Sequence, residues 1–104
     1  MQGTSLEIDI DDFQQEHAAG ATLIDVREPA EYQAGHVPGA ILVPLSELRD
    51  RLDDLPRDQQ FFVICEAGGR SYSAASALSR AGYQAVSVRG GTSGWRRRGL
   101  PVER

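Results

Sequence analysis

Four consecutive apolar residues, Phe61 to Ile64, place the strongest constraint on how this chain can fold. A strand that is apolar at every position needs cover on both faces, which is typical of the centre of a parallel sheet. Further short apolar runs lie at residues 6–8, 21–26, 40–43 and 85–88. Helical patterns separate these runs, so the sequence predicts an α/β fold with a mainly parallel sheet and helices on both faces.

The expected helices fill the intervals between the strands. They cover residues 9–20, 29–34, 45–55 and 71–81, and a last one carries Trp95. Asp9 is expected to cap the first helix with its side chain. In the third interval leucines recur at steps of three and four, as one face of a helix requires; they are Leu45, Leu48, Leu52 and Leu55.

Size and composition favour a single small domain. The 104 residues suit one domain spanning 1–104, with no need for a metal or a disulfide to fold. The net charge is −4 with no dominant basic block, so no nucleic-acid partner is expected. No apolar stretch is long enough for a membrane span, and Met1 to Ser5 does not open a secretory signal. The single cysteine fits a reducing, cytoplasmic location.

That cysteine, Cys65, ends the most apolar strand and opens the loop Cys65-Glu66-Ala67-Gly68-Gly69-Arg70-Ser71. The two glycines allow positive φ, so successive amides can form a concave nest for an anion. Unpaired amides at the start of the next helix and the Arg70 guanidinium add further donors. The pattern therefore places the thiol at the entrance of an anion cradle, at the sheet edge where ligands of such folds bind.

A thiol at this position is expected to ionise readily, because helix N-termini and nearby arginines lower the pKa of a cysteine. The exposed thiolate would act as a nucleophile on sulfur, phosphorus or arsenic centres that carry anionic oxygens, and the residues alone do not choose among them. A lone cysteine at a strand end is more often a small buried hydrophobic residue. The two glycines and the arginine after it favour catalysis here.

Four motifs of the chain resemble those of the rhodanese family, in the family's order. The cysteine loop is similar to the family pattern C-x-x-G-x-R-S. The other three are Leu23–Glu28, then Glu31-Tyr32 with Gly35–Ile41, and finally Gly90–Trp95 with Gly99–Val102. The resemblance extends from Ile8 to Val102 and implies a three-layer α/β domain around a five-stranded sheet.

The resemblance also implies a sulfurtransferase of the thiosulfate type that needs no cofactor and no metal. Cys65 would take a sulfane sulfur from a small sulfur-containing anion such as thiosulfate and hold it as a persulfide. Cyanide, a thiol or a protein acceptor would then remove it. The residues expected to cradle the persulfide are Glu66, Ala67, Gly68, Gly69 and Arg70, and the guanidinium of Arg70 would assist anion binding.

Three more residues are expected to support the site without reacting: Asp25, Arg27 and Ser71. Asp25 ends a strand and would anchor neighbouring loops through hydrogen bonds. Arg27 would pair with an acid such as Glu31, four positions further on. His36 is expected to hold a turn.

The acidic residue in the loop, Glu66, bears on the choice of donor. Its carboxylate would oppose both the thiolate and a dianionic donor, so we expect weak use of thiosulfate and preference for a protein persulfide or another donor. Two alternatives stay open. One is a non-catalytic binding or regulatory module, and the other is a phosphatase or arsenate reductase on the same scaffold. The latter enzymes carry a longer loop than the six residues from Cys65 to Arg70.

Overall fold

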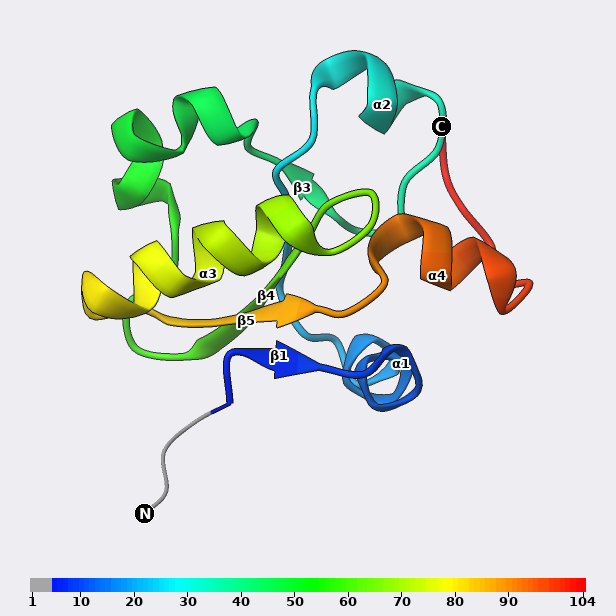
Figure 1. The fold of residues 1–104 in the computed structure, drawn as a ribbon, viewed down its shortest axis with the longest axis horizontal. Coiled ribbons are helices and arrows are strands. Elements are labelled where there is room, and N and C mark those ends of the chain that lie inside the picture. The colour runs from blue at the N-terminus through cyan, green and yellow to red at the C-terminus, as the bar shows by residue number, and fades with distance from the viewer. Residues whose placement is uncertain (1–4) are drawn as a thin grey trace.

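A computed structural model describes residues 5–104. The expectation that Met1 to Ser5 opens no secretory signal therefore falls mostly outside the described residues. The fold is built on a five-stranded parallel sheet of order β1-β5-β4-β2-β3 (Figure 1). The strands are β1 Glu7–Ile8, β2 Leu23–Asp25, β3 Ile41–Leu42, β4 Gln60–Ile64 and β5 Gln84–Val88. The predicted parallel sheet is confirmed.

Helical segments cover both faces of this sheet. They are α1 Ile10–Ala18, α2 Pro29–Gln33, the 3-10 segment η1 Leu45–Asp54, α3 Gly69–Arg80 and α4 Gly91–Arg97. In Figure 1, α3 and η1 lie on one side of the sheet and α1 lies on the other. The fold therefore has the three layers that the sequence predicts.

The central strand β4 divides the core into two clusters by simple alternation. Phe61 and Val63 pack with residues of η1 and α3, whereas Phe62 and Ile64 pack with residues of α1 and α4. All four side chains are at most 2% exposed. Burial of a large apolar side chain contributes about 1.5–3 kcal/mol, so this strand is a major source of stability. The expectation of a strand covered on both faces is confirmed.

The segment from Leu45 to Leu55 departs from the predicted α-helix. It forms a 3-10 helix that is interrupted at Arg51, where φ is −119° and ψ is 22°. In a 3-10 helix, residues three apart share a face. The leucine steps of three, 45 to 48 and 52 to 55, therefore suit two 3-10 turns, and the step of four between them spans the kink. Leu48 and Leu55 are buried and Leu52 is partly buried, but Leu45 is 39% exposed, so only part of the predicted leucine face packs on the core.

Smaller differences occur at the ends of elements. The third strand is limited to Ile41–Leu42 instead of residues 40–43, and the helix expected from Ser71 begins at Gly69. Asp9 precedes α1 with extended backbone but makes no side-chain cap. Its carboxylate instead lies 3.2 Å from the Arg89 guanidinium, because an ionic partner is available nearby.

The topology brings two site residues to one edge of the sheet. β2 and β4 are neighbours, with Asp25 opposite Ile64, so the chain leaves both strands side by side. Cys65 follows at the end of β4, and α3 begins four residues later. Among residues 5–104 no helix is long and apolar enough to cross a bilayer.

Candidate active site

The sulfur of Cys65 is surrounded by hydrogen-bond donors of its own loop. It lies 3.1 Å from the amide nitrogen of Gly68, 3.3 Å from that of Ser71 and 3.4 Å from the Ser71 hydroxyl. The turn depends on Gly68, whose φ of +110° is a conformation that other residues rarely adopt. Two main-chain amides and one hydroxyl of the loop thus lie around the thiol sulfur.

The loop amides point inward because helix α4 holds the loop carbonyls from outside. The Thr92 amide donates to the Cys65 carbonyl over 2.9 Å, and the Ser93 amide donates to the Glu66 carbonyl over 3.0 Å. In a trans peptide the N–H of the next residue points opposite to the carbonyl, and no peptide among residues 5–104 is cis. The amides of Glu66 and Ala67 therefore face away from α4, toward the loop interior.

Close contact between α4 and the loop requires a glycine at the start of α4. A Cβ atom on Gly91 would lie 2.5 Å from the Cys65 carbonyl oxygen and 2.6 Å from that of Glu66. Gly91 also has φ of +58°. A larger residue at this position would push the helix away from the carbonyls that it holds, so the twin glycines before Thr92 serve the geometry of the site.

The electrostatics of the loop favour the thiolate. Burial raises the pKa of the Cys65 thiol, but hydrogen bonds outweigh this effect and hold the pKa below its ordinary value. The contributing donors, in order, are the Ser71 hydroxyl and the amides of Ser71, Gly68 and Ala67. The amides of Gly69, Arg70 and Glu66 have no acceptor within the described part of the chain, so they can bind a further anionic atom.

One feature of the thiol differs from the prediction. Cys65 was expected to lie exposed at the entrance of the cradle, yet it is 1% exposed and packs against the core cluster that includes Val63 and Ala75. The reason is that its sulfur points into the loop, where the amides close around it. A reacting molecule must therefore be small, or the loop must open.

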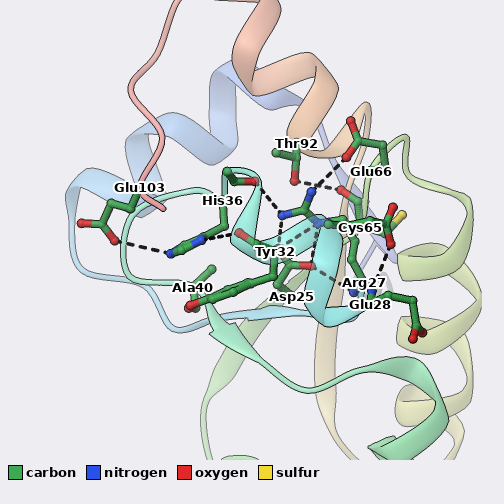
Figure 2. A network of polar contacts seen from close by, with 12 residues as sticks. Asp25, Arg27, Glu28, Tyr32, His36, Ala40, Cys65, Glu66, Thr92 and Glu103 are labelled. Atoms are coloured by element: carbon green, nitrogen blue, oxygen red, sulfur yellow. Dashed lines mark hydrogen bonds and ion pairs between the residues drawn. The ribbon is translucent and has the colours of Figure 1, made fainter.

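A buried ion pair supports the loop from β2. The Asp25 carboxylate accepts hydrogen bonds from Nε and Nη2 of Arg27, and from the Arg27 amide, at 2.8–3.1 Å. Both side chains are at most 1% exposed. Nη1 of Arg27 donates to Glu66, and Nη2 donates to the Gly35 carbonyl as well as to Asp25; both of these further contacts span 2.9 Å. Figure 2 shows this guanidinium between the strand end, the cysteine loop and α2.

The expected partner of Arg27 was wrong. Arg27 pairs with Asp25 and Glu66 instead of Glu31, which pairs with Arg70. The four-residue spacing between Arg27 and Glu31 would bring them together only within one helix. Here α2 begins at Pro29, after Arg27, so that rule does not apply.

The Glu66 carboxylate, which we expected to oppose the thiolate and a dianionic donor, is bound by three other side chains. It accepts hydrogen bonds from Arg27, Ser93 and Arg96. Burial raises the pKa of Glu66, but the hydrogen bond from Ser93 and the charges of the two arginines lower it by more. The net pKa is therefore below its usual value, and the carboxyl group stays ionised. Since two guanidinium groups balance its charge, Glu66 opposes the thiolate less than its position in the sequence suggests.

Arg70 also has a partner. Its two terminal nitrogens each lie 2.9 Å from one Glu31 oxygen, a bidentate pair between α3 and α2. This contact lowers the pKa of Glu31 to about 2 and raises that of Arg70. The arginine expected to bind anions is therefore already engaged by a carboxylate.

Sequence reasoning missed the contributions of Ser87, Thr92 and Ser93. The Ser87 hydroxyl on β5 is fully buried and lies 2.7 Å from the Ser71 hydroxyl. A polar residue in the middle of an apolar strand was a usable signal for Ser87. The hydroxyl residues after the Gly90-Gly91 pair were a usable signal for a helix start. His36 does hold a turn, since its ring nitrogen lies 2.8 Å from the Tyr32 carbonyl.

Together, the fold and the loop define a class of protein: a parallel α/β domain that surrounds one cysteine with main-chain amides at the end of its central strand. Comparisons with known proteins identify the family within this class. The profile of the family described as "Rhodanese-like domain" matches residues 9–98. The chain therefore belongs to the rhodanese-like family.

Individual relatives agree with this assignment. A protein of Allochromatium vinosum named "Sulfurtransferase" is 35% identical over 99 residues, which cover 92% of each chain. A rhodanese-related protein from Thermoplasma volcanium has a crystal structure with a TM-score of 0.86 and 39% identity, covering 93% of this chain and 96% of that one. An HTH-type transcriptional regulator of Mycobacterium tuberculosis, Rv0324, is 40% identical over 94 residues, and the chain spans 41% of its length.

Proposed function

We propose that this protein is a sulfurtransferase that carries a sulfane sulfur as a persulfide on Cys65. The observation that carries this proposal is the placement of the Cys65 sulfur 3.1 Å and 3.3 Å from the amides of Gly68 and Ser71. These donors stabilise a thiolate, which is the nucleophilic form of cysteine. The relative named as a sulfurtransferase supports the same reaction class.

The proposed reaction has two steps that exchange sulfur–sulfur bonds. The Cys65 thiolate attacks the outer sulfur of thiosulfate, a new S–S bond forms, and sulfite leaves with the electron pair of the broken bond. The outer sulfur of the resulting persulfide carries negative charge. We infer that the amides of Glu66, Gly69 and Arg70 hold it, because they have no acceptor within residues 5–104. A thiolate or cyanide then takes this sulfur and releases the Cys65 thiolate.

The burial of the thiol requires a donor whose sulfane sulfur can reach into the loop in the first step. The single cysteine supports a reducing setting, because the chain has no second thiol to regenerate an oxidised sulfur. We therefore propose that the protein acts in the cytoplasm, as one domain over residues 1–104. Thiosulfate and persulfides are both candidate donors.

Mass spectrometry of the intact protein tests the function directly. Incubation with thiosulfate should add one sulfur atom to Cys65, and subsequent cyanide should remove it with formation of thiocyanate. Cys65→Ser should gain no sulfur under the same conditions. A wild-type protein that stays unmodified with thiosulfate and with an organic persulfide would refute the proposal.

A second candidate is a binding or regulatory module. Two observations favour it: the thiol is 1% exposed, and a similar domain forms part of a transcriptional regulator. In this case the loop would bind a small anion without sulfur transfer. The same mass measurement separates the candidates, because a module leaves Cys65 unchanged while anion binding remains detectable by calorimetry.

A further inference from the structure

The guanidinium of Arg70 at the start of α3 is occupied by a carboxylate from α2. Its two terminal nitrogens donate to the two oxygens of Glu31, each over 2.9 Å. Such a paired contact uses the fork of donors that would otherwise grip an anion. A donor molecule that engages Arg70 must therefore displace Glu31 or share the guanidinium with it.

Glu31 is itself fixed in this position. Its Oε1 atom also accepts the Glu28 amide over 3.0 Å, as part of a capping box at the start of α2. The Arg70 hydrogen bond holds the pKa of Glu31 at about 2, so its carboxyl group stays ionised at neutral pH. The side chains of Glu31 and Arg70 are 33% and 39% exposed, which leaves the pair within reach of a dissolved anion.

The charges around the loop balance one another. Three carboxylates and three guanidinium groups surround it in paired contacts: Asp25, Glu31 and Glu66 against Arg27, Arg70 and Arg96. The Cys65 thiolate adds one negative charge to this neutral set. A dianion such as thiosulfate therefore meets no excess of positive charge at the site, in contrast to what an unpaired Arg70 would provide.

We propose that Glu31 determines donor specificity by occupying Arg70. The site then favours organic sulfane-sulfur donors with one negative charge over the inorganic dianion thiosulfate. This inference rests on the proposed sulfurtransferase function. Glu31 acts through Arg70 as a positioning residue and does not touch the transferred sulfur.

Steady-state kinetics with two donors of different charge test this assignment. Thiosulfate carries two negative charges and benzenethiosulfonate carries one, and both pass a sulfane sulfur to a thiolate. In Glu31→Gln, the side chain keeps its size and an oxygen for the Glu28 amide, but it no longer neutralises the positive charge of Arg70. The KM for thiosulfate should fall about five-fold, the upper range for an exposed ion pair. The KM for benzenethiosulfonate should fall about two-fold, because the attraction scales with donor charge.

Two variants serve as controls for Glu31→Gln. Glu31→Asp keeps the negative charge and should retain the wild-type preference between the two donors. Asp11→Asn removes a carboxylate of α1 from an exposed ion pair with Arg98, the residue after α4, and should change neither KM. An unchanged ratio of the two KM values in folded Glu31→Gln would overturn the role of Glu31.

Calorimetry separates this inference from the proposed function. Thiosulfate is titrated into Cys65→Ser and into Cys65→Ser/Glu31→Gln, which cannot turn over. About five-fold tighter binding by the double variant supports the role of Glu31. If wild-type protein transfers no sulfur, that separate result overturns only the proposed function. Equal affinities alongside normal wild-type turnover would overturn the role of Glu31 and leave the function of Cys65 intact.

Discussion

Replacing Ser71 with alanine should reduce the thiolate population of Cys65. The Ser71 hydroxyl lies 3.4 Å from the sulfur and 2.7 Å from the Ser87 hydroxyl. Within residues 5–104, Ser71 is the only hydrogen-bond partner of the Ser87 hydroxyl, so the buried Ser87 proton is satisfied only if Ser87 donates to Ser71. The Ser71 proton then remains available for the thiolate or for the Gly68 carbonyl, 3.2 Å away.

The size of the effect follows from the loss of one hydrogen bond to the charged form. A net hydrogen bond contributes about 1 kcal/mol, which corresponds to about a five-fold change in an equilibrium constant. Loss of a donor to the thiolate raises the pKa of Cys65. The rate of alkylation by iodoacetamide should therefore fall about five-fold at pH values below the midpoint of its pH profile, and should match wild type well above it.

A stability control is needed because Ser71→Ala leaves the buried Ser87 hydroxyl without a partner. This defect costs about 1–3 kcal/mol and should lower the urea midpoint of unfolding. In Ser71→Ala/Ser87→Ala both hydroxyls are gone, so part of the stability should return while the alkylation rate stays low. If folded Ser71→Ala alkylates with the wild-type pH profile, the reasoning about the loop donors is wrong.

Three further predictions concern the scaffold around the loop. Arg27→Ala should destabilise the fold by about 3–5 kcal/mol in urea unfolding, because it leaves Asp25 buried without its cation; a loss below 1 kcal/mol would contradict this. Gly91→Ala should abolish sulfur loading, measured by mass spectrometry, whereas Gly39→Ala, with positive φ but no atom within 4 Å of its Cβ, should retain loading. Glu31 has a lowered pKa, so its stabilising contribution is complete above its ordinary value of 4.5 and is lost as pH falls toward about 2; wild type should lose more stability than Glu31→Gln across that range in acid unfolding.

The fold could be read from the sequence because its strongest elements are local. The apolar run from Phe61 to Ile64 can be buried only in the middle of a sheet, and the structure confirms this. The type of helix from Leu45 to Leu55 was harder to predict, since leucine steps of three and four fit one α-helix as well as two 3-10 turns. Only the backbone at Arg51 distinguishes them.

The site was predictable in part for the same reason. The amides around Cys65 belong to a continuous stretch of sequence, so the glycine pattern was sufficient to place them. Two of the ion pairs were not predictable, because their partners are distant in the chain: Glu66 lies 39 residues after Arg27, and Arg70 lies 39 residues after Glu31. Such pairs depend on how β2, α2 and the loop pack together.

The grip of α4 on the loop carbonyls has a consequence for how the protein is made. Thr92 and Ser93 supply the amides that orient the peptides after Cys65. During translation, a nascent chain that stops short of these residues already contains the cysteine and its strand, but nothing yet fixes the direction of the loop peptides. On this reasoning, the thiol reaches its final reactivity after the last helix has left the ribosome and docked. We therefore expect a chain truncated before Thr92 to gain no sulfur on Cys65.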